Sequence, residues 1–253
     1  DAGNQIDILA ESTLIRYIQL FYIDIDVPKT AYHGEYLIDI ARQLKDEWGK
    51  ELLSKEKEEQ LRICKKFAFN SLINKIEEDL DYFGIKFDNF FYESSLHNGD
   101  IEHAINYLKD RGYIYEKEGA LWFKSTEFDD DKDRVVVKSD GSLTYLAADI
   151  AYHLDKIERG YDKLINVWGA DHHGYIDRVK AAIEALGYPK DTLEIIIVQI
   201  VNLLRDGEKI KMSKRAGELV TMTDVIDEVG KDAARYFYIM RSSDSHFDFD
   251  LEL

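Results

Sequence analysis

Residues 131–205 alternate between short apolar runs and amphipathic segments, and this alternation limits the possible folds more than any other feature. Strands that are separated by helices of this length favour right-handed crossovers and a mostly parallel sheet. The sequence therefore predicts an α/β fold, in which ligands bind beyond the carboxyl ends of the strands. The predicted strands are 134–137, 163–169 and 193–204, and the predicted helices are 144–160 and 173–187.

The first 130 residues show a different pattern, in which apolar side chains mostly recur at helical spacing. Helices are predicted at 5–22, 34–49, 55–84 and 98–112, and a β-hairpin is predicted at 113–125. The acidic run 127–133 then separates this part of the chain from the alternating part. We therefore expect two regions, a mostly helical one at 1–130 and an α/β one at 131–253.

The composition favours a soluble globular protein, because 45% of the 253 residues are hydrophobic and 33% are charged. The most apolar stretch, 193–204, is too short to span a membrane, and the opening DAGNQIDILAES lacks the basic start of a signal peptide. The single cysteine, Cys64, excludes an internal disulfide and is expected on the buried side of a helix. These features predict a cytoplasmic protein with no membrane partner.

The stretch KIKMSKRAG (209–217) gathers cationic side chains in a chain whose net charge is −17. That net charge argues against nonspecific nucleic-acid binding over the whole surface, but it leaves room for a local basic groove. Lysines suit phosphate oxygens and stabilise the charge that develops in phosphoryl or nucleotidyl transfer, and we expect Lys214 and then Lys211 to act in this way. The alternative is a solvated basic loop.

The sequence GADHHG (169–174) follows the strand predicted at 163–169 and lies at the expected ligand edge. Its two glycines allow a ligand to approach the backbone closely, and Asp171, His172 and His173 lie between them. We favour a nucleotide or metal site here. The alternative is structural, with Asp171 capping a helix that starts at residue 173.

Tyr145 and Asp149 lie four residues apart and therefore on one face of the helix predicted at 144–160. The neighbours of Asp149 in the sequence are mostly apolar, and a carboxylate in such a setting is costly to bury unless a cation meets it. A carboxylate beside a tyrosine can clamp a guanidinium group, which prefers planar, bidentate acceptors. Pairing of Asp149 with a lysine or arginine of this chain explains the pattern equally well.

Several of these motifs together resemble a known family. The stretch KMSKR resembles the signature loop of class I aminoacyl-tRNA synthetases, and VWGADHHGYIDRVKAAIEALG resembles the bacterial arginyl-tRNA synthetases in particular. The segments DAGNQ, SDGSLTYLAADIAYH and HFDFDLEL are also similar to that family, so the resemblance extends over essentially the whole chain. It implies the second half of a Rossmann-like nucleotide-binding fold at 131–253, preceded by a largely helical inserted, or connective, region at 1–130.

The resemblance also implies a reaction and its participants. Members of the family activate L-arginine with ATP, which Mg²⁺ accompanies, and then transfer the arginyl group to tRNA(Arg). Tyr145, Asp149, His173 and Asn4 would then contact the arginine, and Lys211 and Lys214 would stabilise the charge on the transferring phosphate. The implied ATP-binding residues are Gly169, Asp171, His172, Met212 and Ser213, and no metal-binding side chain is implied.

The first signature of the family, a His-Ile-Gly-His tetrapeptide, is not found in these 253 residues. The segments YHGEY (32–36) and DHHGY (171–175) do not match its pattern. The anticodon-binding helices of the family are also missing after Leu253. We therefore expect an internal fragment of a synthetase, which by itself cannot activate arginine.

Two other classes of protein remain possible from the sequence. In a metal-dependent phosphoesterase, ADHHG would supply Asp and His ligands and the Asp24-x-Asp26 pair would add carboxylates. That pair, however, lies in a predicted helical region, far from a sheet edge. In a noncatalytic tRNA-contacting module, binding would depend on the 209–215 loop and would survive changes at Tyr145 and Asp149.

Overall fold

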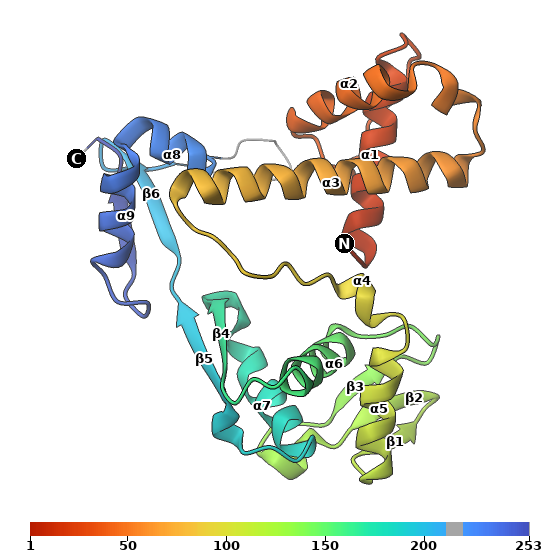
Figure 1. Ribbon diagram of the computed structural model, residues 1–253, viewed down its shortest axis with the longest axis vertical. Coiled ribbons are helices and arrows are strands. Elements are labelled where there is room, and N and C mark those ends of the chain that lie inside the picture. The colour runs from red at the N-terminus through yellow and green to blue at the C-terminus, as the bar shows by residue number, and fades with distance from the viewer. Residues whose placement is uncertain (211–219, 253) are drawn as a thin grey trace. The chain divides into compact units, whose positions relative to one another are not determined.

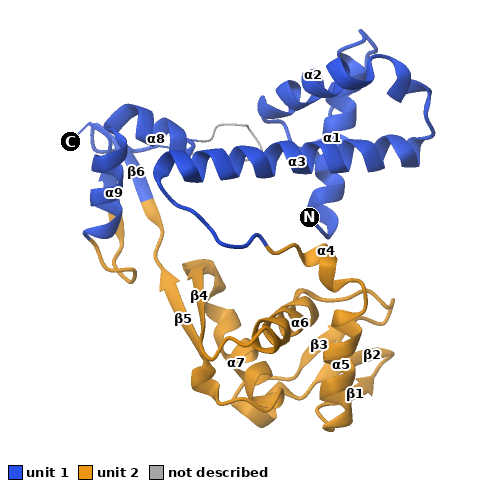
Figure 2. Cartoon of the chain, viewed as in Figure 1, with its two compact units in different colours: residues 1–90, 202–240, 248–253 blue, residues 91–201, 241–247 orange. Residues whose placement is uncertain are grey.

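The computed structural model of the protein describes residues 1–210 and 220–252 (Figure 1). The chain folds into two compact units, which are coloured separately in Figure 2. Unit 1 comprises residues 1–90, 202–240 and 248–253, and unit 2 comprises residues 91–201 and 241–247. The chain thus passes from unit 1 to unit 2 and back. No helix of the described residues is long and apolar enough to cross a lipid bilayer.

The first part of unit 1 is a bundle of α1 (Asn4–Gln19), α2 (Tyr36–Trp48) and α3 (Lys57–Phe83), with η1 (Glu51–Ser54) before α3. These helices confirm the ones predicted at 5–22, 34–49 and 55–84. The long helix α3 ends at Gly84, whose φ of 83° is accessible to glycine without strain. Cys64 is fully buried in the core between these helices, as the sequence predicted.

The second part of unit 1 contacts the C-terminal end of α3. It contains β6 (Val201–Arg205), β7 (Glu208–Lys209), α8 (Met222–Val229), α9 (Lys231–Ile239) and β8 (Phe247–Asp250), with the strand order β7-β6-β8. Arg235 donates to the carbonyl oxygen of Phe83 at 2.9 Å, and the Tyr82 hydroxyl donates to Asp227 at 3.1 Å. These bonds join segments that are more than 140 residues apart in the sequence.

Unit 2 starts with α4 (Glu93–Leu96), α5 (Asp100–Asp110) and an antiparallel sheet of β1 (Ile114–Lys117), β2 (Ala120–Phe123) and β3 (Arg134–Val137). The predicted hairpin is confirmed as β1 and β2. The acidic run is not an open linker, because Asp130 in it is buried and accepts two hydrogen bonds from Arg134. The compact units therefore do not follow the predicted boundary at residue 130, although the assignment of the two regions to family domains remains a prediction.

The rest of unit 2 alternates between helices and strands, as the sequence predicted (Figure 1). Strands β4 (Leu164–Gly169) and β5 (Leu193–Val198) pair in parallel, and the crossover between them contains α7 (Ile176–Ala185). Helix α6 (Tyr145–Glu158) precedes β4 and buries its apolar residues in the core of the unit. The short helices η2 (Ser125–Phe128), η3 (Ala170–Tyr175) and η4 (Lys190–Thr192) complete the unit.

Two predictions about strands were wrong in detail. The apolar run 193–204 forms two strands, β5 and β6, which belong to different sheets, and the chain leaves β5 where the Gln199 amide donates to the carbonyl oxygen of Ser243. The predicted mostly parallel sheet is also not found. Among the described strand pairs whose direction is defined, β4–β5 is parallel, whereas β1–β2, β2–β3 and β6–β7 are antiparallel. An apolar run shows that a strand is buried but not which strand it pairs with.

Candidate active site

Asp149 lines a cavity of about 150 Å³ between α4 and α6 in unit 2. A second carboxylate, that of Glu93, lines the same cavity. Phe91 and Tyr152 form one aromatic wall, with stacked rings whose centroids are 4.4 Å apart. The remaining lining residues are Leu96 and Ala148. Two carboxylates among apolar and aromatic groups make a site that suits a cation with a flat, partly apolar body.

The electrostatics of the cavity also favour a cation. Burial, and next the charge of Glu93, raise the pKa of Asp149 to about 6, while Lys156 and His172 act in the opposite direction. A carboxylate with a raised pKa gains from a nearby positive charge, because the charge restores the stability of the ionised form. The opposing effect of His172 also places the residues after β4 within electrostatic reach of Asp149.

Among the described residues, Lys156 is the lysine whose charge acts on Asp149, but its ammonium group forms a hydrogen bond with another residue. Its ammonium group donates to Oδ1 of Asn166 at 3.1 Å and lies 4.5 Å from the centre of the Tyr152 ring. Within the described residues, the Asp149 carboxylate forms no ion pair within 4.0 Å. Pairing of Asp149 with a lysine or arginine, which the sequence left open, is therefore not observed among the residues that the structure describes.

His153 is buried one turn after Asp149 and is held by two hydrogen bonds. Its Nδ1 lies 2.7 Å from the backbone carbonyl oxygen of Asp149, and its Nε2 lies 2.9 Å from Nδ2 of Asn166. Burial, and next the charge of Lys156, lower the pKa of His153 to about 4. The ring is therefore neutral at pH 7, and it links α6 to β4 through Asn166.

Tyr145 is the first residue of α6 and is 65% exposed. It lies one turn before Asp149, as predicted, but it does not line the cavity. The start of α6 is fixed by Thr144, whose hydroxyl donates to the carbonyl oxygens of Val135 and Val136 on β3. Tyr145 is thus held at a defined place while its ring remains open to solvent.

GADHHG forms the end of β4 and the 3₁₀-helix η3. Asp171, His172 and His173 are all exposed, and the His172 ring packs edge-on against Trp168 at 6.0 Å between centroids. A side chain at Gly169 would approach Oδ1 of Asp171 to 2.7 Å, so this glycine makes room for that carboxylate. The alternative function of Asp171 as a helix cap is wrong, because α7 begins at residue 176 and has no side-chain cap.

The remaining predicted site residues lie either in unit 1 or outside the described residues. Asn4 is the first residue of α1 in unit 1 and is exposed. Four more predictions lie outside the described residues, and these are Lys211, Met212, Ser213 and Lys214. Glu93 was missed by the sequence analysis, since an acidic residue in a short helix of a strongly acidic chain gives no local signal.

The residues of the rival phosphoesterase are not assembled into a metal site in the described part of the chain. No group of three or more His, Cys, Asp or Glu side chains there could hold a metal ion. Asp24 and Asp26 are exposed in the segment between α1 and α2. The Asp-x-Asp pair and ADHHG belong to different compact units.

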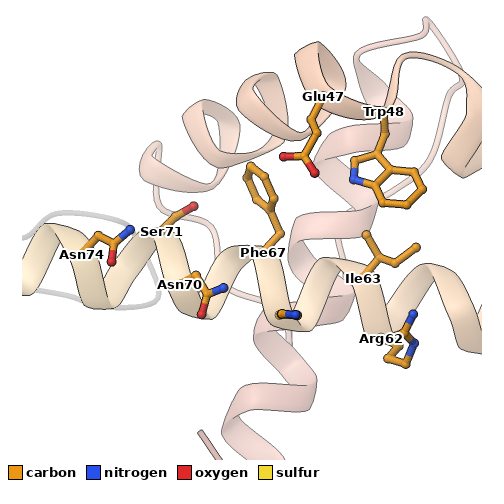
Figure 3. Close-up of a pocket in the computed structure, with 9 residues that line it drawn as sticks. Glu47, Trp48, Arg62, Ile63, Phe67, Asn70, Ser71 and Asn74 are labelled. Carbon is orange, nitrogen blue, oxygen red and sulfur yellow. The ribbon is translucent and has the colours of Figure 1, made fainter. Parts of the chain in front are cut away.

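A larger hollow of about 460 Å³ lies in unit 1, between α2 and α3 (Figure 3). Figure 3 shows Glu47 and Trp48 extending from α2 toward Ile63 and Phe67 of α3. None of the site residues predicted from the sequence lines this hollow. Apart from Asn4, the predicted residues that the structure describes instead lie on α6, at the end of β4 and in η3, which makes that part of unit 2 the candidate active site.

Comparison with known proteins identifies the family to which the chain is similar. A family model described as "tRNA synthetases class I (R), catalytic domain" matches residues 4–243. The chain is 55% identical over 254 aligned residues to an arginine–tRNA ligase of Bacillus licheniformis and 52% identical to that of Bacillus subtilis. Both alignments cover the whole chain but 46% of the relative, so the chain spans about half the length of these proteins.

Solved structures agree with these sequence matches. A Campylobacter jejuni protein described as an arginyl-tRNA synthetase superposes with a TM-score of 0.91 and 42% identity, over 100% of this chain and 55% of that one. The arginyl-tRNA synthetase of Thermus thermophilus gives a TM-score of 0.66 at 16% identity, over 97% of this chain and 52% of that one. The second likeness shows the shared fold alone.

Proposed function

Because the chain belongs to the class I tRNA synthetases (R), catalytic-domain family, we propose that it is part of an arginine–tRNA ligase. The complete enzyme would activate L-arginine with ATP and transfer the arginyl group to tRNA(Arg). The observation that carries this proposal beyond the family match is the pair of carboxylates, Asp149 and Glu93, in one cavity with a stacked aromatic pair. A guanidinium group is planar, permanently charged and suited to such a site.

In this proposal Asp149 accepts hydrogen bonds from the guanidinium group of arginine, and Glu93 adds a second negative charge. Tyr145, one turn before Asp149 and exposed, would contact the same substrate, together with His173 and Asn4. The raised pKa of Asp149 supports this assignment, because the free carboxylate lacks the cation that would stabilise its charge.

The chemical step would need no protein nucleophile. The arginine carboxylate attacks the α-phosphorus of ATP, an oxygen–phosphorus bond forms, and pyrophosphate leaves. The terminal adenosine hydroxyl of the tRNA then attacks the arginyl carbonyl carbon, and AMP leaves. Catalysis of this kind depends on positioning and on charge stabilisation, which we assign to Lys211 and Lys214.

ATP would be bound by Gly169, Asp171 and His172, with Met212 and Ser213 in the lysine-rich loop. The aromatic groups at the end of β4 support a contact with the adenosine, since the exposed His172 ring lies there and packs edge-on against the half-buried Trp168 ring. Mg²⁺ is proposed as the ion that accompanies the triphosphate, and no side chain of the described residues is assigned to it. A cytoplasmic location follows from the proposed part in protein synthesis.

The proposal is tested by ATP–pyrophosphate exchange in the presence of tRNA, measured for each of the twenty amino acids on the full-length product of the natural reading frame. We expect exchange with arginine alone. Exchange with a different amino acid would reject the assigned substrate. Exchange with none would reject the ligase and would direct attention to manganese-dependent phosphoesterase activity.

A further inference from the structure

We propose that Asn166 is a positioning residue, which keeps the ammonium group of Lys156 away from Asp149 and so leaves that carboxylate free for a cationic substrate. The inference rests on the proposed use of Asp149 as the acceptor for arginine. It concerns residues of β4 and α6 that do not themselves line the cavity.

In the chain of hydrogen bonds from Lys156 through Asn166 to His153, only one assignment of donors and acceptors is consistent. A lysine ammonium group only donates, so Oδ1 of Asn166 must accept from Lys156, at 3.1 Å. The amide nitrogen of Asn166 must then donate to Nε2 of His153, at 2.9 Å. His153 consequently carries its proton on Nδ1 and donates to the carbonyl oxygen of Asp149, at 2.7 Å. Asn166 is therefore the residue that joins the lysine to the histidine in this chain of bonds.

Lys156 lies seven residues after Asp149 on α6, about two helical turns away on the same side of the helix. Burial is the largest influence on its pKa and lowers it to about 8, while the charge of Asp149 raises it. A partly buried ammonium group that loses its hydrogen-bond acceptor needs another partner. Asp149 is the acceptor with the strongest electrostatic influence on it, which makes this carboxylate the expected replacement.

The ring of Tyr152 also helps to hold the ammonium group of Lys156 in this position. The centre of its ring lies 4.5 Å from the Lys156 nitrogen, and its stacked partner, Phe91, belongs to the cavity wall. An aromatic face attracts a cation without offering it a carboxylate. Asn166 and Tyr152 together thus retain a positive charge near the site, where it offsets part of the burial of Asp149, but hold it out of direct contact.

The consequence is a competition between an internal and an external cation for one carboxylate. With Asn166 in place, the substrate guanidinium meets a free acceptor. Without Asn166, the substrate would have to displace Lys156 first. A partly buried ion pair of this kind should raise the KM for arginine by about fivefold, with little change in kcat.

The test is a double-mutant cycle on the full-length enzyme, with arginine KM and kcat measured by ATP–pyrophosphate exchange. Asn166→Leu should raise the arginine KM about fivefold and leave the KM for ATP unchanged. Lys156→Met should leave the arginine KM within about twofold of wild type, and it should restore the KM of Asn166→Leu when the two are combined. The loss of the hydrogen bond to His153 is common to Asn166→Leu and the double variant, so the rescue isolates the effect of the lysine charge.

An unchanged arginine KM in Asn166→Leu would overturn the inference. A raised KM that Lys156→Met does not restore would also overturn it, because Asn166 would then act through the packing of β4. Asp149→Asn provides the independent check on the underlying proposal. If that variant binds arginine as the wild type does, the carboxylate is not the acceptor, whatever the outcome of the cycle.

Discussion

At the scale of single residues, the charge state of Asp149 links the structure to substrate binding. Its pKa of about 6 lies above that of a solvated aspartate, mainly because of burial and next because of Glu93. The folded protein therefore holds a proton on Asp149 at a pH where the unfolded chain has lost it. The ionised form makes the folded state less stable as the pH rises from about 4 to about 6, and a bound cation reverses that effect.

The arginine KM of the full-length enzyme should therefore fall as the pH rises through about 6, where Asp149 becomes ionised. In Asp149→Asn we expect a KM at least roughly tenfold higher, without this pH dependence, since the guanidinium group loses a charged acceptor. Steady-state exchange kinetics between pH 5 and pH 8 provide the measurement. The matched control is Asp162→Asn, which changes an exposed aspartate and should leave the KM and its pH dependence unchanged.

Thermal unfolding separates this effect from misfolding. Asp149→Asn should be as stable as the wild type at pH 4 and more stable by roughly 1 kcal/mol at pH 8, because it removes a poorly solvated charge. If Asp149→Asn is less stable than the wild type at both pH 4 and pH 8, a disturbed fold, and not the loss of the charged acceptor, would explain weaker arginine binding.

At the scale of secondary-structure elements, α8 is stabilised by a capping box at its first turn. The Thr221 hydroxyl accepts from the Asp224 amide at 3.1 Å, and the Asp224 carboxylate accepts from the Thr221 amide at 2.8 Å. The Asp224 carboxylate also accepts from the Thr221 hydroxyl at 2.7 Å, and the bonds that it accepts from the amide and the hydroxyl of Thr221 lower the pKa of Asp224. They also fix where the helix begins, at Met222.

Thr221→Ala should lower the free energy of unfolding by about 1 kcal/mol, because the first turn of α8 loses its cap. Urea denaturation followed by circular dichroism checks this value. Thr223→Val in the same helix is the control, since the Thr223 hydroxyl is buried and makes no hydrogen bond with any residue that the structure describes. The control should be at least as stable as the wild type, and equal effects of the two substitutions would contradict the capping argument.

At the scale of the whole molecule, the residues proposed to bind arginine come from distant parts of the chain. Asp149 is on α6 and Glu93 is on α4, both in unit 2, and the proposal also includes Asn4 at the start of α1. The chain spans 46% of the length of its arginine–tRNA ligase relatives, and the first family signature is not found in its sequence. The proposed activity is therefore assigned to the full-length protein.

The isolated 253-residue chain is expected to show no arginine-dependent ATP–pyrophosphate exchange, whereas the full-length protein does. Part of the nucleotide pocket and of the amino-acid pocket should be supplied by sequence outside this chain. A cooperative thermal transition of the isolated chain would serve as the control for folding. Exchange by the isolated chain at a rate near that of the full-length protein would show that the chain contains a sufficient site.

The sequence by itself determined the features that depend on local pattern. It predicted the helices of residues 1–112, the β1–β2 hairpin, the parallel placement of β4 and β5, and the position of Asp149 on α6 one turn after Tyr145. Each depends on side-chain periodicity or on turn residues, which a short stretch of chain expresses alone. The family resemblance rested on motifs of the same local kind and was confirmed by the family match.

The tertiary structure decided which distant groups meet. Glu93 reaches the cavity of Asp149 from another helix, and Asn166 on β4 accepts the hydrogen bond of Lys156. The apolar run 193–204 is divided between two sheets. The apolar neighbours of Asp149 in the sequence indicated that its carboxylate needs a cation if it is buried, but local pattern cannot show whether Lys156 supplies that cation. That depends on the packing of α6 against β4, where a neutral amide directs the internal cation away from the carboxylate.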